Sequence, residues 1–243
     1  MPLSTVPNPD SPRRGSRLST LHSLAGAVLA VYVVWHLSFY ARAMSGEPVL
    51  TRAVSRLSSR PWLLAVVAIA VLGVLGLHAA YGIKLMADKW KAGSIKALQR
   101  ATGIAVLAFL AYHVVEFEIP LLSGSIDAGE IYPRLAQRLS STAASIPIHA
   151  WIYLLAVLAV SMHACIGAHS LCVSTGLAVS PRSRKIAAGL IGVAGFALLL
   201  LGSDIVIYFA AGERFFVPNA IVRPRPLGSA DCDPLLLAPP PRR

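Results

Sequence analysis

Four histidines stand inside four separate apolar stretches of the chain. They are His36, His78, His113 and His163. An imidazole is costly within a lipid bilayer, and ionisable residues at membrane depth usually serve a function. A single such histidine is most often a hydrogen-bonding partner between helices. One histidine in each of four stretches instead indicates metal binding through imidazole nitrogen.

The histidines pair by depth once the stretches are treated as successive helices. Each one lies in the second half of its stretch, in chain direction. Because successive helices run in opposite directions, His36 and His113 fall at one depth, and His78 and His163 at the other. The members of each pair belong to diagonal helices of an up-down bundle. Each pair is therefore predicted to face across the bundle core.

Two imidazoles facing each other are the ligands of a bis-histidine haem, so two pairs predict two stacked haem b groups. Zinc or copper fits less well, because these metals take three or four ligands at a single depth. A c-type haem is excluded, since the sequence contains no CxxCH motif. The predicted metal ligands are the four histidines of the two pairs.

The elements that position these side chains must cross a membrane. Hydrophobic residues make up 56% of the 243 residues, charged residues 14%, and the mean hydropathy is +0.65. A soluble domain of this size is less apolar and more charged. The predicted fold is an all-α integral membrane protein whose first four transmembrane helices form an up-down bundle around the haems. Runs of about 20 apolar residues place the five helices at 21–44, 62–86, 102–122, 147–173 and 186–211.

The net charge of +11 indicates how the chain is oriented in the membrane and does not indicate a nucleic-acid-binding surface. Basic residues lie in the connections between the apolar runs and not on one folded face, so we expect no nucleic-acid partner. The segment before the first run and the second and fourth connections are basic, whereas Arg42, Arg52, Arg56 and Arg60 lie on the opposite side. Because the third connection carries no net positive charge, we expect a cytoplasmic N-terminus. Residues 1–20 are predicted to be a flexible arm, and residues 212–243 a proline-rich tail.

Small residues and carboxylates accompany the histidines. Gly26 of the first run, and Gly73, Gly76 and Gly82 around His78, leave room for a flat ligand or for close helix packing. Glu116 and Glu118 follow His113 on the outer side. These two residues could relay protons during quinone chemistry or be solvated carboxylates at the end of a helix, and the second interpretation is preferred. The long connection between the third and fourth runs is expected to hold a short surface helix.

The segments around the histidines resemble a known family. They are LHSLAG, WHLSFY, LHAAYGIKL, RATGIAVLAFLAYH and SMHACIGAHSLCVSTGLAVSPRSRK. Over residues 21–210 they resemble the five-helix, di-haem cytochrome b anchor of succinate:quinone oxidoreductases (succinate dehydrogenases) and quinol:fumarate reductases. The resemblance implies a multi-pass subunit of the bacterial inner (cytoplasmic) membrane, with flavoprotein and iron–sulfur subunits on its cytoplasmic face. It also implies electron transfer through both haems to a quinone, usually menaquinone.

The resemblance also implies residue roles. His78 and His163 would ligate the proximal haem, nearer the cytoplasm, and His36 and His113 the distal haem. His22, near the inner surface, is a candidate partner of the proximal haem propionates. His149, at the outer end of the fourth helix, is a candidate for the distal haem or a quinone headgroup. A simple interfacial side chain is the alternative for both.

No residue of this chain is predicted to catalyse dicarboxylate chemistry. The sequence has no dinucleotide-binding glycine fingerprint and no cysteine cluster for iron and sulfur. Two other functions stay open at this point, namely a stand-alone di-haem electron carrier and a proton-coupled transporter that uses the intramembrane histidines. The subunit anchor is favoured because the chain offers a basic docking surface made by Lys84, Lys89, Lys91, Arg182, Arg184 and Lys185.

Overall fold

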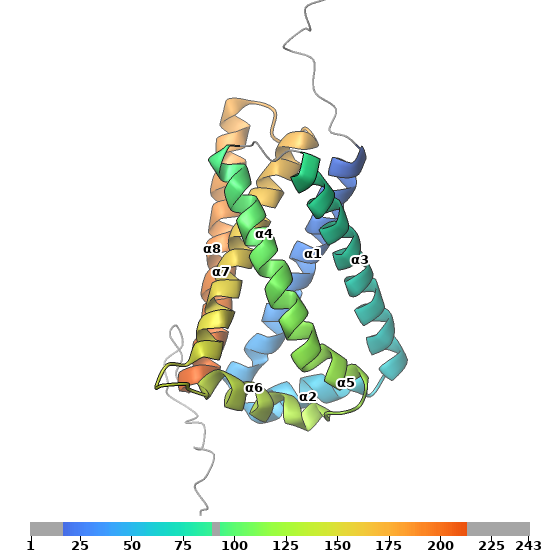
Figure 1. Ribbon diagram of the computed structural model, residues 1–243, viewed down its shortest axis with the longest axis vertical. Helices are drawn as coiled ribbons and strands as arrows, with labels where there is room; N and C mark the ends of the chain where they lie inside the picture. Colours follow the sequence, from blue (N-terminus) through green and yellow to red (C-terminus); the bar gives the residue numbers. More distant parts are fainter. Residues whose placement is uncertain (1–16, 89–92, 213–243) are drawn as a thin grey trace, which may run out of the picture.

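Five long helices form the body of the molecule, a computed structural model that describes residues 17–88 and 93–212 (Figure 1). All five are long and apolar enough to cross a membrane, which confirms the predicted all-α membrane fold. Most of the predicted N-terminal arm and almost all of the predicted C-terminal tail lie outside the described residues. The helices are α1 (Arg17–Tyr40), α3 (Pro61–Asp88), α4 (Ser94–His113), α7 (Ile148–Ser174) and α8 (Pro181–Ala211).

Three of these helices begin well before their predicted starts, and one of them is α1, which begins at Arg17 instead of residue 21. The third predicted span started at residue 102, but α4 begins at Ser94, and α8 begins at Pro181 instead of residue 186. The added turns carry basic residues, whose long side chains reach away from the apolar zone while the backbone stays helical. Ser180 caps α8 by accepting a hydrogen bond from the Ser183 amide at 3.1 Å. The apolar run is therefore shorter than the helix that contains it.

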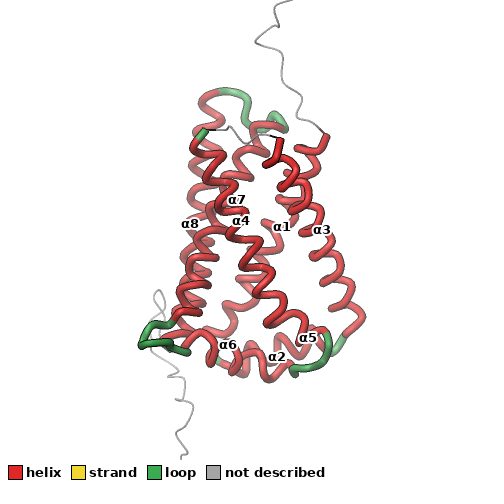
Figure 2. The backbone as a smooth tube through the Cα atoms, viewed as in Figure 1, coloured by secondary structure: helices red, strands yellow, loops and turns green. Residues whose placement is uncertain are grey.

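Shorter helices close one end of the bundle, which we call the α2–α6 end (Figure 2). They are η1 (Ala41–Ser45), α2 (Glu47–Ser58), α5 (Ile119–Leu122), η3 (Ala128–Glu130) and α6 (Ile131–Ser140). Helix α6 confirms the expected surface helix, whereas α2 was not predicted. Its apolar residues Leu50 and Val54 lie four positions apart on one face and are 0% and 3% exposed. The largest fully buried side chains of the described residues, Leu50, Ile131 and Leu139, all belong to this end.

The spanning helices pack in the order α3, α1, α7, α4, with α8 against α7. Helices α1 and α4 are therefore diagonal, as are α3 and α7, which is the arrangement expected of an up-down bundle. Small residues on α8 let α7 approach closely. A Cβ placed on Gly202 would lie 2.6 Å from Val157 Cγ1, and one on Gly195 would overlap the Cys165 side chain. As expected, α8 completes the packing.

Candidate functional site

The interior histidines meet in two pairs between diagonal helices. The ring centres of His36 on α1 and His113 on α4 are 5.9 Å apart, and those of His78 on α3 and His163 on α7 are 6.0 Å apart. The ring planes within the pairs cross at 82° and 87°. The structure therefore brings together the same histidines that depth along the helices had paired.

The spacing within each pair leaves room for one metal ion between two imidazoles, although an ordinary ring pair, His113 and Tyr153, has the same distance of 5.9 Å. A ligating nitrogen lies about 2 Å from such a metal, and the ring centre about 1 Å further, so two opposed rings have centres about 6 Å apart. Rings in direct stacking contact lie closer, as His22 and His78 do at 4.0 Å. A zinc or copper site would need three or four such ligands. Among the described residues, no three His, Cys, Asp or Glu side chains converge in that way.

Hydrogen bonds at Nδ1 fix the orientation of the rings. His163 Nδ1 donates to the Gln99 carbonyl at 3.1 Å, and His78 Nδ1 donates to the His22 carbonyl at 3.0 Å. His113 Nδ1 is bonded to the Tyr153 hydroxyl at 3.2 Å. With its proton on Nδ1, a histidine presents the Nε2 lone pair to a metal, and such outer bonds are typical of metal-binding histidines.

His22 is joined to His78 by a reciprocal contact. Each Nδ1 lies 3.0 Å from the backbone oxygen of the other residue, and the rings are stacked at an angle of 14°. His22 therefore supports a predicted ligand directly, a role that the sequence analysis did not give it. Its predicted pairing with haem propionates stays a prediction.

Glycines on the facing helices make room for the rings. A Cβ on Gly26 would lie 2.8 Å from His78 Cε1, and one on Gly103 would lie 2.9 Å from His163 Cε1. Of the three glycines expected to open space around His78, Gly82 instead lies against His22, at 3.1 Å. A Cβ on Gly73 or Gly76 would meet nothing within 4 Å. Gly26 therefore admits a close neighbour, as expected, whereas Gly73 and Gly76 make no close packing contact and their room for a flat ligand stays a prediction.

His149 lies near the His36–His113 pair but does not belong to it. Its Nδ1 is 3.3 Å from the hydroxyl of Tyr112, the residue before His113. Tyr112 also lies beside Glu116 and Arg138. Burial lowers the pKa of Arg138, but its hydrogen bond to Tyr112 and the charge of Glu116 outweigh that effect and raise it. The guanidinium of Arg138 therefore stays a cation.

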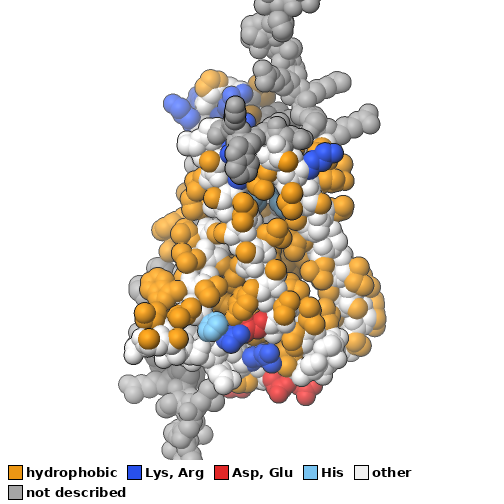
Figure 3. Space-filling model, viewed as in Figure 1, with side chains coloured by type: hydrophobic (Ala, Val, Ile, Leu, Met, Phe, Trp, Pro, Cys, Tyr) orange, Lys and Arg blue, Asp and Glu red, His pale blue; other side chains and the backbone are white. Residues whose placement is uncertain are grey.

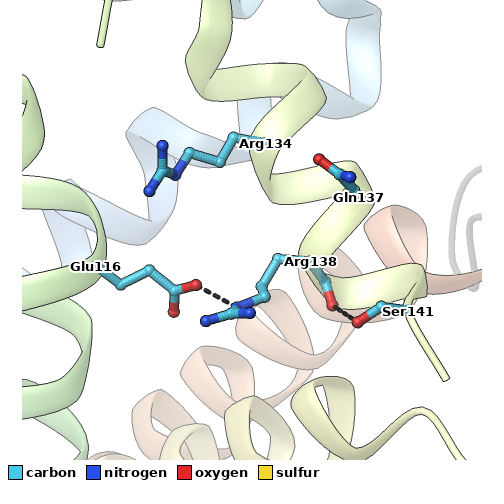
Figure 4. A pocket seen from close by; sticks show the side chains of 5 residues that line it. All are labelled: Glu116, Arg134, Gln137, Arg138 and Ser141. Atoms are coloured by element: carbon cyan, nitrogen blue, oxygen red, sulfur yellow. Dashed lines mark hydrogen bonds and ion pairs between the residues drawn. The ribbon is translucent and has the colours of Figure 1, made fainter. Parts of the chain in front are cut away.

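A pocket of about 340 Å³ lies between the end of α4 and helix α6 (Figure 4). An ion pair between Glu116 and Arg138 crosses it. The sequence analysis did not predict the arginines of this pocket, although positions 134 and 138 share one face of a helix. The lining residues are Glu116, Arg134, Gln137, Arg138 and Ser141.

The fold and these contacts define a membrane protein with five spanning helices and two intramembrane imidazole pairs. Residues 89–202 match the family described as succinate dehydrogenase/fumarate reductase transmembrane subunit. The chain is also 29% identical over 198 residues to the succinate dehydrogenase cytochrome b558 subunit of Bacillus subtilis (strain 168), an alignment that covers 78% of this chain and 94% of that protein. Both similarities are to the family that the motifs of the sequence resemble.

Proposed function

We propose that this chain is the di-haem cytochrome b anchor of a succinate dehydrogenase and passes electrons from the iron–sulfur subunit to a membrane quinone. The observation that carries the proposal is the pair of imidazole contacts at 5.9 and 6.0 Å. The match of residues 89–202 to the family model supports it, and the similar Bacillus protein is itself named a cytochrome b558 subunit. No comparable support exists for a transporter or a stand-alone carrier.

In this proposal His78 and His163 hold the proximal haem and His36 and His113 the distal haem. A bound b-type haem supplies one-electron iron chemistry. The protein fixes the imidazoles by the Nδ1 bonds described above and keeps water away with the apolar helices around them. The quinone, which the resemblance implies is menaquinone, is placed at the α2–α6 end, beside the distal pair.

We place the opposite end of the bundle, where α1 begins, in the cytoplasm. Basic residues near a membrane surface favour the cytoplasmic side, and several lie at this end. The face in Figure 3 is largely hydrophobic at mid-height, with lysine and arginine toward the ends. The basic surface at the end where α1 begins is the proposed contact for the iron–sulfur and flavoprotein subunits. The flavoprotein carries out succinate oxidation. The described members of the basic surface are Lys84, Arg182, Arg184 and Lys185, while Lys89 and Lys91 lie outside the described residues.

A haem assay tests the proposal most directly. The purified chain, or its complex, is expected to contain two protoporphyrin haems per chain in a pyridine haemochrome measurement, because each imidazole pair holds one. Reduced-minus-oxidised spectra should show low-spin b-type bands, since both axial positions are occupied by nitrogen. A haem content near zero would overturn the proposal.

Gly26→Ala should disturb the proximal site although residue 26 is not a ligand. Its Cβ would lie 2.8 Å from His78 Cε1, so the ring must move from its place opposite His163. We expect one haem component to be lost or to change its midpoint potential, and redox-titrated absorption spectra would measure either effect. Gly192→Ala on α8 is the matched control, because a Cβ there meets nothing within 4 Å. Identical spectra in the two variants would show that the Gly26 contact does not position the ligand.

A further inference from the structure

We infer that Glu116 is the carboxylic acid that exchanges protons with the quinone, and that Arg138 is its positioning residue. The inference rests on the proposed function, to which it adds the group that handles protons. It begins from the pocket between α4 and α6, where Glu116 supplies the only carboxylate of the lining. The Glu116 side chain is 10% exposed.

The two oxygens of Glu116 have different surroundings. Oε1 is paired with Arg138, the Tyr112 hydroxyl also interacts with the carboxylate, and Oε2 is buried without a hydrogen bond of ordinary geometry among the described residues. A buried polar atom without a partner is costly and rare in a folded protein. Figure 4 shows the carboxylate directed at the side chains of α6 across the pocket. A ligand hydroxyl, such as that of a quinol, would donate the hydrogen bond that Oε2 of the carboxylate lacks.

A change in helix type aims Glu116 at the pocket. Helix α4 ends at His113 and continues as a π-helical turn over Val114–Glu118. Pro120 explains the turn, because its ring would clash with the carbonyl four residues earlier, at residue 116, in a regular α-helix. Glu116 then pairs with α6, while Glu118 lies near Tyr32 and Tyr40 of α1. The turn therefore sends the two carboxylates to different neighbours.

The rest of the lining suits a neutral ligand that carries carbonyl oxygens. Arg134, Gln137, Arg138 and Ser141 share one face of α6 or its end, and all of them can donate hydrogen bonds. The pocket begins one helical turn beyond the distal ligand His113. A quinone headgroup bound there would lie beside its electron source, with a carboxyl group on one side and donors on the other.

The proposed step balances as follows. Reduction of the quinone takes up two electrons, which a haem held by His36 and His113 would supply, and two protons, so each carbonyl oxygen becomes a hydroxyl. For each O–H bond formed, the Glu116 carboxyl gives up its proton and becomes a carboxylate. Arg138 holds that carboxylate in place by charge until it takes another proton from water at the outer surface. Quinol oxidation uses the same steps in reverse.

Glu116→Gln tests this assignment in the assembled complex. The amide keeps the shape of the side chain but cannot give up a proton in the same way. We expect the kcat of quinone reduction by succinate to fall roughly 100-fold, the scale of a lost general acid, with KM for quinone and the haem spectra retained. Glu116→Asp should recover much of the rate. Glu130→Gln, the same change at a carboxylate that caps η3 at this end of the molecule, is the control and should behave as wild type.

The outcomes separate the two proposals. Wild-type complex that cannot reduce quinone would overturn the proposed function itself. Wild-type complex that reduces quinone, with Glu116→Gln and Glu130→Gln equally active, would overturn only the role of Glu116. If Glu116→Gln fails to assemble, Arg138→Gln replaces it, because that change leaves the carboxyl group present but without its ion pair. A fall confined to quinone reduction then supports the inference, and an unchanged rate overturns it.

Discussion

Replacing His78 or His163 by alanine is expected to remove the proximal haem and leave the distal one, and replacing His36 or His113 the reverse. The physical reason is that each haem depends on one imidazole pair, and the two pairs share no ring. A haem that loses one of its two axial bonds binds more weakly, and its low-spin spectrum is lost. Redox-titrated difference spectra of purified complex should therefore show one component missing in each variant.

His169→Ala provides the control for these four variants. His169 lies on α7, as His163 does, but outside both pairs, so its loss should leave both haem components in place. The pattern across variants is the decisive result. If His36→Ala and His78→Ala removed the same component and spared the other, the pairing proposed from the structure would be wrong.

Loss of the distal pair should separate two activities of the complex. In His36→Ala or His113→Ala, succinate oxidation by a soluble artificial acceptor should stay close to the wild-type rate, because the flavoprotein and iron–sulfur subunits do not depend on the distal haem. Quinone reduction should fall by more than 100-fold, since the electron path to the α2–α6 end is broken. Parallel assays of both activities in one preparation measure the difference.

The subunit composition of the complex must be shown first, because loss of assembly would lower both activities. His169→Ala again serves as the control, with both rates retained. Equal loss of the two activities in complex shown to be intact would place the quinone at the proximal side. That result would contradict the proposed site at the α2–α6 end and leave the two-haem assignment standing.

The sequence predicts the bundle and the histidine pairs well because both follow from simple periodicity. Apolar length fixes the spanning helices, and their alternating direction puts His36 level with His113. The boundaries are less predictable, since a helix continues into charged turns such as the one containing Lys96. Helix α2 was not predicted because Gly46 and Pro48 are typical of the end of a helix, although proline is also favoured in a first turn.

The pocket could not have been predicted from the sequence. Glu116 and Glu118 are equivalent by composition and spacing, and only the π turn before Pro120 separates their neighbours. Arg138 reaches Glu116 across a connection whose path depends on how α6 folds back over the bundle. The reciprocal bonds of His22 were missed for a similar reason, because they depend on the height of α3 relative to α1.

That reciprocal contact has a consequence for how the bundle holds its alignment. His22 and Gly26 on α1, and His78 and Gly82 on the antiparallel α3, repeat one four-residue spacing, and each histidine faces the glycine of the other helix. A slide of α3 by one helical turn, about 5.4 Å, would break both hydrogen bonds and empty both glycine recesses at once. No intermediate position satisfies half of the contact. The contact between His22 and His78 therefore fixes the register of α3 against α1, and it sets the height at which His78 meets His163.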